Sequence, residues 1–129
     1  MNLCPEMEEI GYGMPLITRG WVKLYAVTGD HKYLDAAIEA GKALHQLQLP
    51  EGSWYGRIFA DTGEPFDHDP TDFVFTALAL MEDLAYYTSD PKWLETRGKA
   101  LDFVMQGFLK DFSFPRGVGH CQDFPPDKY

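Results

Sequence analysis

Hydrophobic residues recur at helical spacing in four stretches of this chain, and each stretch is bounded by residues that start or end helices. The pattern predicts helices over residues 15–27, 31–47, 70–87 and 92–110. Strict apolar–polar alternation is confined to short connecting pieces, so no large sheet is expected. The chain is therefore predicted to be all-α.

Three of the four predicted helices carry an apolar stripe opposite charged residues, and such stripes face a core. The first helix is expected to carry its stripe on Leu16, Ile17, Trp21, Leu24 and Tyr25. The second is expected to carry it on Leu34, Ala37, Ile38, Gly41 and Leu44. The fourth is expected to bury Leu94, Leu101, Val104, Met105 and Phe108.

The third predicted helix, residues 70–87, is apolar on nearly every face, which is typical of a helix in a protein interior. It is too short, and too interrupted at Glu82 and Asp83, to cross a bilayer. An acid-rich loop precedes it. Pro70 fits the first turn of a helix, and Asp69 is placed to cap it.

Breaks between the helices have recognisable turn chemistry. Gly29 suits a left-handed position after the first helix, and Asp30 is placed to cap the second. Residues 50–53 break the chain, residues 54–59 form a short extended piece, and residues 61–65 form a turn.

The two helix pairs are copies of one another. Residues 28–35, TGDHKYLD, match residues 88–95, TSDPKWLE, at a constant offset of 60 residues. A period of this length that contains two helices is a helical-hairpin repeat. We therefore divide the chain into an irregular lead-in, hairpin one (14–49), a β-excursion and loop (50–69), hairpin two (70–110) and an irregular tail (111–129).

Composition narrows the function classes. The 129 residues are 45% hydrophobic, which excludes a disordered chain, and the net charge is −9. There is no run of lysine or arginine, so nucleic acid and anionic membranes are not expected as partners. No ligand cluster with metal spacing is found, and we expect no metal and no cofactor. The two cysteines and the absence of a signal-like N-terminus favour a cytoplasmic location.

The repeat resembles a known superfamily. Thr28-Gly29-Asp30-x-x-Tyr33-Leu34-x-x-Ala37 is similar to the hairpin turn of the α/α toroids, especially the six-hairpin glycosidases and the N-acylglucosamine 2-epimerase family. The segment 52–65 resembles the β-excursion that those sugar enzymes carry between hairpins. The resemblance covers about residues 14–118. It implies a partial or oligomer-completed α/α toroid that acts on carbohydrate as a glycoside hydrolase, lyase or epimerase.

A second resemblance points to another reaction. Gln48-x-x-x-Gly52-x-Trp54 is similar to the glutamine–tryptophan repeat of squalene-cyclase-like terpene cyclases, and Asp67-x-Asp69 is similar to their acidic motif. Pro70 and Thr71 stand where that motif would continue with an aspartate and a threonine. A terpene-cyclase or prenyltransferase-like toroid is the alternative enzyme. A non-catalytic helical-repeat binding or scaffold module is the alternative without catalysis.

The candidate catalytic residues are Asp67, Asp69 and Asp72, because carboxylates gathered at the mouth of a cavity can act as general acid and base. Helix capping alone is the competing interpretation of the same residues. The candidate substrate-binding residues are the aromatic, cationic and imidazole side chains that flank this loop or precede the first helix. These are Trp54, Tyr55, Arg57, His68 and Tyr12.

Two hairpins leave more apolar helix surface than they can cover by themselves, since the third helix is apolar all round. We therefore expect a homo-oligomer or a part of a longer chain. The expected ligand is a saccharide or another small molecule.

Overall fold

The computed structural model describes residues 7–9, 13–66, 68 and 74–111, with side chains described within residues 13–66, 68 and 74–106. The elements in these ranges are β1 (Met7–Glu9), α1 (Gly13–Thr28), α2 (His31–Leu47), β2 (Arg57–Phe59), α3 (Val74–Tyr87) and α4 (Lys92–Asp111). The prediction of an all-α protein is confirmed. Each predicted helix is found, although residues 70–73 at the start of the third lie outside the described ranges.

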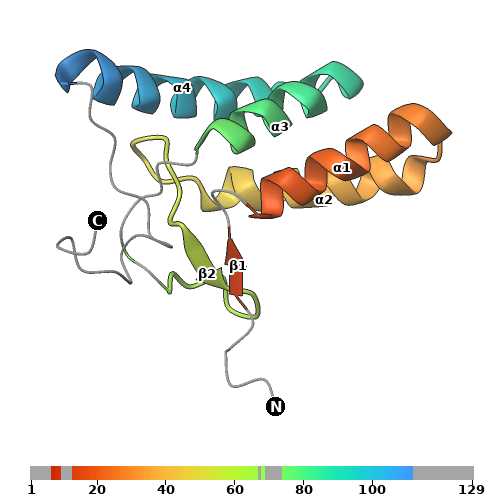
Figure 1. Ribbon diagram of the computed structural model, residues 1–129, viewed down its shortest axis with the longest axis horizontal. Coiled ribbons are helices and arrows are strands. Elements are labelled where there is room, and N and C mark those ends of the chain that lie inside the picture. Colours follow the sequence, from red (N-terminus) through yellow and green to blue (C-terminus); the bar gives the residue numbers. More distant parts are fainter. Residues whose placement is uncertain (1–6, 10–12, 67, 69–73, 112–129) are drawn as a thin grey trace, which may run out of the picture.

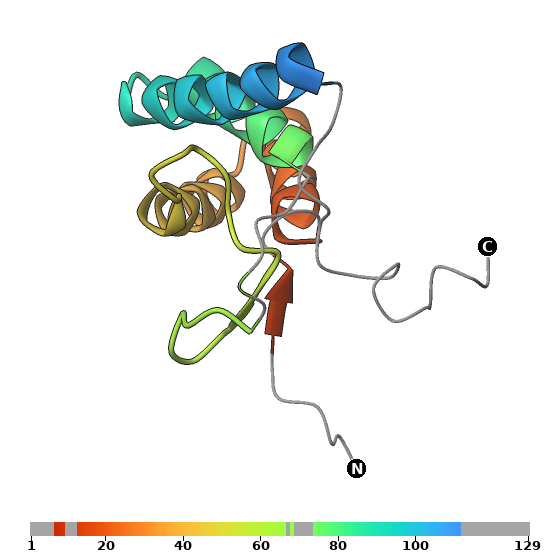
Figure 2. The same cartoon turned by 90° about the vertical axis from the view of Figure 1, so that its left-hand side faces the viewer.

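The helices form two hairpins stacked on one another. Figure 1 shows α3 and α4 lying above α1 and α2, with the small sheet on the opposite side of α1 and α2. The turned view in Figure 2 shows the four helices as two layers of two. α3 packs against both α1 and α2, whereas α4 reaches α2. The long axes of the helices run together, so each layer presents one broad face to its neighbour.

The turn between the helices is built in the same way in both hairpins. Gly29 has the predicted left-handed conformation, with a φ of 70°. The Thr28 hydroxyl donates to the carbonyl of Leu24 at 2.7 Å, and the Thr88 hydroxyl donates to the carbonyl of Leu84 at 2.7 Å. These contacts repeat at the predicted offset of 60 residues.

The hydrophobic core lies between the two layers of helices. At Gly41 on α2, side chains of the second hairpin approach the helix backbone closely. A Cβ atom at Gly41 would collide with the side chain of Leu84 and lie 2.9 Å from the ring of Trp93. Leu84 and Trp93 are both buried, and they reach the α2 backbone because Gly41 has no side chain. The expected burial of α2 through Leu34, Ala37, Gly41 and Leu44 is confirmed.

The expected core face of α1 is largely wrong, and that of α4 is confirmed at Val104 alone among its described residues. α1 buries Pro15, Thr18 and Val22, whereas the apolar residues expected to face the core are largely exposed. Their exposed fractions are Leu16 44%, Ile17 62%, Trp21 37% and Leu24 43%.

In α4 the expected burial of Val104 is confirmed, and Trp93, Thr96 and Ala100 are buried with it. Leu94, Leu101 and Met105 were also expected in the core, but they are 49%, 44% and 42% exposed. The side chain of Phe108 lies outside the described residues. α1 buries the compact Thr18 and Val22, whereas α4 buries the large Trp93, whose ring lies against Gly41, together with smaller residues.

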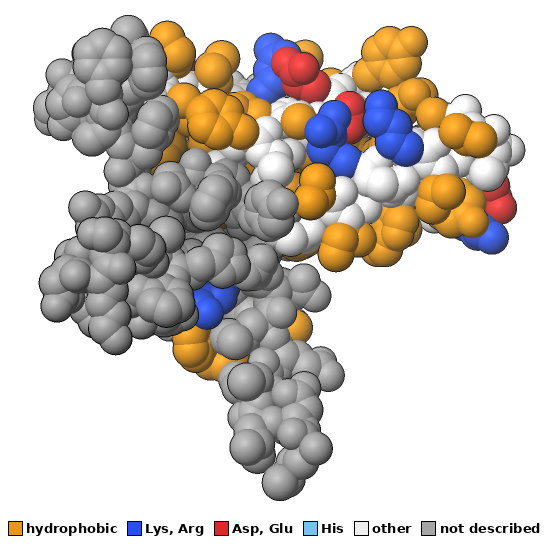
Figure 3. Space-filling view, in the orientation of Figure 1, with side chains coloured by type: hydrophobic (Ala, Val, Ile, Leu, Met, Phe, Trp, Pro, Cys, Tyr) orange, Lys and Arg blue, Asp and Glu red, His pale blue; other side chains and the backbone are white. Residues whose placement is uncertain are grey.

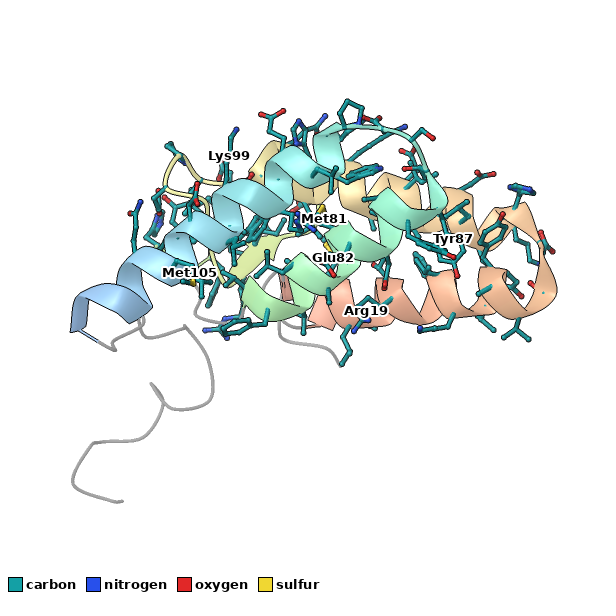
Figure 4. The ribbon with its side chains drawn as sticks, turned by 90° about the horizontal axis from the view of Figure 1, so that it is seen from above. Arg19, Met81, Glu82, Tyr87, Lys99 and Met105 are labelled. Carbon is teal, nitrogen blue, oxygen red and sulfur yellow. The ribbon has the colours of Figure 1, made fainter. Side chains whose placement is uncertain are left out.

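Polar contacts join the two hairpins across this core. The guanidinium of Arg19 on α1 forms an ion pair with Asp83 on α3 at 2.8 Å, and the labels in Figure 4 locate Arg19 beside α3. The imidazole Nδ1 of His45 lies 2.7 Å from the Thr96 hydroxyl. The Gln48 amide donates to the carbonyl of Thr96 at 2.9 Å. These bonds satisfy polar groups that the layers would otherwise bury unpaired.

The chain between the hairpins folds as a β-hairpin of its own. Gly63, with a φ of 73°, turns the chain, and its N–H donates to the Phe59 carbonyl at 2.8 Å. The predicted turn over residues 61–65 is thus confirmed. The lead-in was expected to be irregular, but Met7–Glu9 pairs antiparallel with β2, with Glu8 opposite Ile58. This pairing spans about fifty residues of sequence, and nothing local indicates it.

Candidate functional site

The predicted site residues fall into two groups. Asp67, Asp69 and Asp72, predicted to be catalytic, lie outside the described residues, and so does Tyr12. Trp54, Tyr55, Arg57 and His68 are described. They belong to the β-excursion between the hairpins, whose two arms run antiparallel from residue 54 to residue 68.

Trp54 is part of the core. Its side chain is fully buried, and its indole N–H donates to the carbonyl of Leu44 at 2.7 Å. Gly52, with a φ of 105°, brings the preceding loop against the backbone carbonyl of Lys99 on α4. The ring of Trp54 therefore has no face open to a ligand, in contrast to its expected role as a sugar platform.

The glutamine–tryptophan motif has a structural role. The Gln48 amide donates to the Gly52 carbonyl at 3.0 Å as well as to Thr96 on α4. The end of α2, the loop after it and α4 are thus tied together by one side chain. The motif explains how the β-excursion is anchored, and it supplies no reactive group.

Tyr55 and His68 lie opposite each other on the two arms of the excursion. Their ring centroids are 5.9 Å apart and the planes meet at 73°, an edge-to-face arrangement. The pairing of Ile58 with Pro65 and the hydrogen bond from the Phe66 N–H to the Arg57 carbonyl set this register. Tyr55 is half-buried and His68 is exposed. The structure thus brings together two residues that the sequence analysis chose separately.

Arg57 continues the same face. Its guanidinium carbon lies 5.0 Å from the ring centroid of Phe66, in cation–π geometry. Phe66 in turn lies edge-to-face with Phe59 at 5.6 Å. Alternate residues of a strand share a face, so Tyr55, Arg57 and Phe59 lie on one side while Trp54 and Ile58 enter the core.

We call this surface the aromatic strip. It consists of Tyr55, Arg57, Phe59, Phe66 and His68. Phe59 and Phe66 were not among the predicted site residues, although the alternation of residues 55, 57 and 59 in an extended segment could have indicated Phe59. Rings with a cation among them suit ligands that offer C–H faces together with polar or anionic groups.

A separate apolar cavity of about 460 Å³ lies between α1, α2 and β2. Its lining is Met14, Ile17, Thr18, Trp21, Ala40, Ala43, Leu47, Ile58 and Ala60. The polar side-chain groups in this lining are the hydroxyl of Thr18, which donates to the Met14 carbonyl at 2.7 Å, and the indole N–H of Trp21. The cavity is large enough for a small ligand or an inserted side chain, and its described walls carry no acid or base.

Metal sites and membrane-spanning helices are two further possibilities for the described residues. No group of three or more histidine, cysteine, aspartate or glutamate residues in the described ranges is arranged to hold a metal ion. Among the described helices, none has the length and hydropathy needed to cross a bilayer. Comparison of the chain with protein-family models, curated proteins and solved structures found no match.

Proposed function

We propose that this protein binds a saccharide on the aromatic strip and acts on it through the carboxylates of the neighbouring acidic loop. The observation that carries the proposal is the pairing of Tyr55 with His68 at 5.9 Å. His68 stands between Asp67 and Asp69 in the sequence, so two candidate acid–base residues adjoin one member of this pair along the chain. The half-buried phenol and the exposed imidazole offer an apolar ring face with hydrogen-bonding edges.

The proposed chemistry is general acid–base catalysis of the hydrolase, lyase or epimerase type. Two carboxyl groups in one site take different roles when their surroundings separate their pKa values. Asp67, Asp69 and Asp72 are the candidate pair or trio. The resemblance to sugar-active α/α toroids supports this assignment, and Arg57 adds a positive charge next to the rings.

Binding is tested by thermal shift and by NMR titration with a panel of neutral and acidic oligosaccharides. A ligand that binds only the folded protein raises its melting temperature. Tyr55→Ala and Phe66→Ala should each weaken the binding of the best saccharide by about tenfold or more, the loss of roughly one well-placed contact. Tyr86→Ala is the matched control, because Tyr86 is an 82% exposed aromatic residue on α3, outside the strip. Equal losses in all three variants, or no stabilisation by any saccharide, would reject the proposal.

Catalysis is tested separately on the acidic loop. If the carboxylates are catalytic, at least one should titrate well above an ordinary aspartate, and its replacement by asparagine should abolish turnover without lowering the melting temperature. If they only cap α3, all three should titrate at or below the pKa of an ordinary aspartate, because a capping hydrogen bond favours the charged form. Asp69→Asn should then cost at most about 1 kcal/mol of stability. Carboxylate NMR distinguishes the two outcomes directly.

The second candidate is a non-catalytic helical-repeat module, which the apolar cavity favours. Its described lining includes no ionisable side chain, and Ile17 and Trp21 at its edge are exposed. Such a site suits an apolar side chain better than a sugar. Thermal stabilisation by a soluble polyprenyl probe, with none by saccharides, would instead favour the terpene-cyclase-like alternative.

A further inference from the structure

Many of the large apolar residues left exposed by the helices lie on two opposite faces of the stacked hairpins. The lower face, on the side of the small sheet, belongs to α1 and consists of the half-buried Met14 and the exposed Ile17, Trp21 and Leu24. The upper face belongs to α3 and α4 and consists of Phe75, Leu94, Leu101 and Met105. Figure 4 looks down on the upper face, with Met105 labelled, and Figure 3 shows hydrophobic side chains along the outside of the helical layers.

The 60-residue repeat assigns a counterpart to each residue of the lower face. The counterparts are Val74, Ala77, Met81 and Leu84 on α3. All four are fully buried in the interface between the hairpins. The exposed apolar residues of α1 therefore occupy the positions through which α3 docks onto hairpin one.

Each residue of the upper face also has a counterpart 60 residues away, in this case on hairpin one. The counterparts of Phe75, Leu94, Leu101 and Met105 are Pro15, Leu34, Gly41 and His45. Pro15 and Leu34 are buried, Gly41 receives Leu84 and Trp93, and His45 contacts Thr96 on α4. The exposed apolar residues of hairpin two thus occupy the positions with which hairpin one receives its neighbour.

We propose that a second copy of this chain docks head to tail, with its lower face on the upper face of the first. The contact pairs the same two kinds of face that stack the hairpins within one chain, but at a wider spacing, because Leu101 stands where Gly41 lets Leu84 and Trp93 approach the backbone. Each copy offers one face of each kind, and each face matches the opposite face of another copy. The cavity lined by Ile17 and Trp21 opens on the lower face and would be covered by this contact.

The residues that differ between the repeats make the proposed contact more apolar at one pair of positions and more polar at another. His45 and Thr96, which bond across the internal interface, are replaced by Met105 and Ala36. Val22 and Ala37 are replaced by Glu82 and Arg97, which neutralise each other in an ion pair of 2.9 Å on the upper face. Leu101 stands in the place of Gly41, so it supplies a side chain where the internal interface has none.

A heterologous contact of this kind leaves one unmatched face at each end of any open assembly. Addition of copies therefore gives a ring if the rotation between copies closes, and an open filament if it does not. This distinguishes the proposal from a two-fold dimer, in which one face pairs with itself. The proposed contact between copies is formed by the helices and does not involve the aromatic strip, which belongs to the β-excursion.

The test is sedimentation velocity and light scattering of the whole chain over a range of concentrations. The unmodified chain should form species larger than a monomer. Ile17→Asp on the lower face and Leu101→Asp on the upper face should each give monomers when alone. These side chains are 62% and 44% exposed, so the charges should leave the fold intact, which circular dichroism checks. Tyr86→Asp is the matched control and should assemble as the unmodified chain does.

The decisive measurement is the assembly state of a mixture of the two single variants. Ile17→Asp keeps its upper face and Leu101→Asp keeps its lower face, so an equimolar mixture should form dimers that grow no further. Leu24→Asp and Met105→Asp repeat the test with a second pair of positions. A monomeric unmodified chain at every concentration would overturn the proposal. Single variants that still assemble, or a mixture that stays monomeric, would equally overturn it.

Discussion

Asp30 and Asp90 make the same set of contacts at the first turns of α2 and α4. The carboxylate of Asp30 accepts the backbone N–H of Lys32 at 3.1 Å, and that of Asp90 accepts the N–H of Lys92 at 3.0 Å. Each lysine ammonium returns to the same carboxylate, at 3.4 Å and 3.0 Å respectively. The hydrogen bond from the backbone is the main cause that lowers the pKa of both aspartates. α2 and α4 thus begin with the same kind of aspartate cap.

The first prediction concerns acid stability. A carboxyl group whose pKa is lower in the folded state adds stability above the pKa of the unfolded chain, about 3.9, and loses it as the pH falls through the lower folded value. The double variant Asp30→Asn, Asp90→Asn keeps both caps but cannot titrate. Its free energy of unfolding should fall less between pH 6 and about pH 3 than that of the unmodified chain.

Urea unfolding at several pH values measures this difference. The control is Asp35→Asn, which removes a charge from an exposed carboxylate of α2 without touching a cap. A double variant as acid-sensitive as the unmodified chain would show that the two caps contribute nothing to the pH dependence.

The second prediction concerns the packing of α2. Gly41→Ala places a methyl group against Leu84 and Trp93, so it should destabilise the fold by about 1–3 kcal/mol. Gly98→Ala on α4 is the matched change, because a Cβ there meets nothing within 4 Å. It should stabilise the protein by up to about 1 kcal/mol through helix propensity. Opposite signs in urea unfolding would confirm the close approach at Gly41, and equal signs would contradict it.

Helix positions could be predicted because their signals are local. The turn residues at Gly29 and Asp30 and the proline at position 91 set boundaries that agree with His31–Leu47 and Lys92–Asp111. The side of a helix that faces the core is not a local property. α1 offers both Trp21 and Val22, and α4 offers both Ala100 and Leu101. The neighbouring hairpin, which approaches closely, selects the smaller residue in each case.

The aromatic strip was only partly predictable. Tyr55 and His68 were chosen for their residue types near an acidic loop, and the structure brings them together. Trp54 was chosen for the same reason, yet neighbouring residues of an extended segment face opposite sides, so Trp54 and Tyr55 cannot both line one surface. Strand alternation applied to residues 54–59 would have separated them. The pairing of Met7–Glu9 with β2 depends on a distant segment and leaves no mark in the local pattern.

The third prediction concerns Trp54 as a structural residue. Trp54→Phe removes the indole N–H and leaves the carbonyl of Leu44 without this partner in a buried site. The expected cost is about 1–3 kcal/mol of unfolding free energy. Tyr55→Phe should change stability by less than about 0.5 kcal/mol, because Tyr55 is only half-buried. Saccharide binding by folded Trp54→Phe should be unchanged. If Trp54→Phe lost saccharide binding but kept full stability, Trp54 would be a binding residue and not a structural one.

The last prediction concerns Arg19 and Asp83, whose ion pair joins α1 to α3 at 2.8 Å. Their side chains are 35% and 20% exposed, so the pair is screened less than a fully exposed one. A double-mutant cycle of Arg19→Gln and Asp83→Asn should give a coupling of about 0.5–1 kcal/mol that decreases in high salt. The Arg97–Glu82 pair, at 37% and 63% exposed and within hairpin two, is the comparison and should couple less strongly. Urea unfolding of the variants in both cycles measures the two coupling energies. If the coupling of Arg19 with Asp83 is close to zero, then these charges do not help to hold the hairpins together, and apolar packing at Gly41 and Leu84 must account for their stacking.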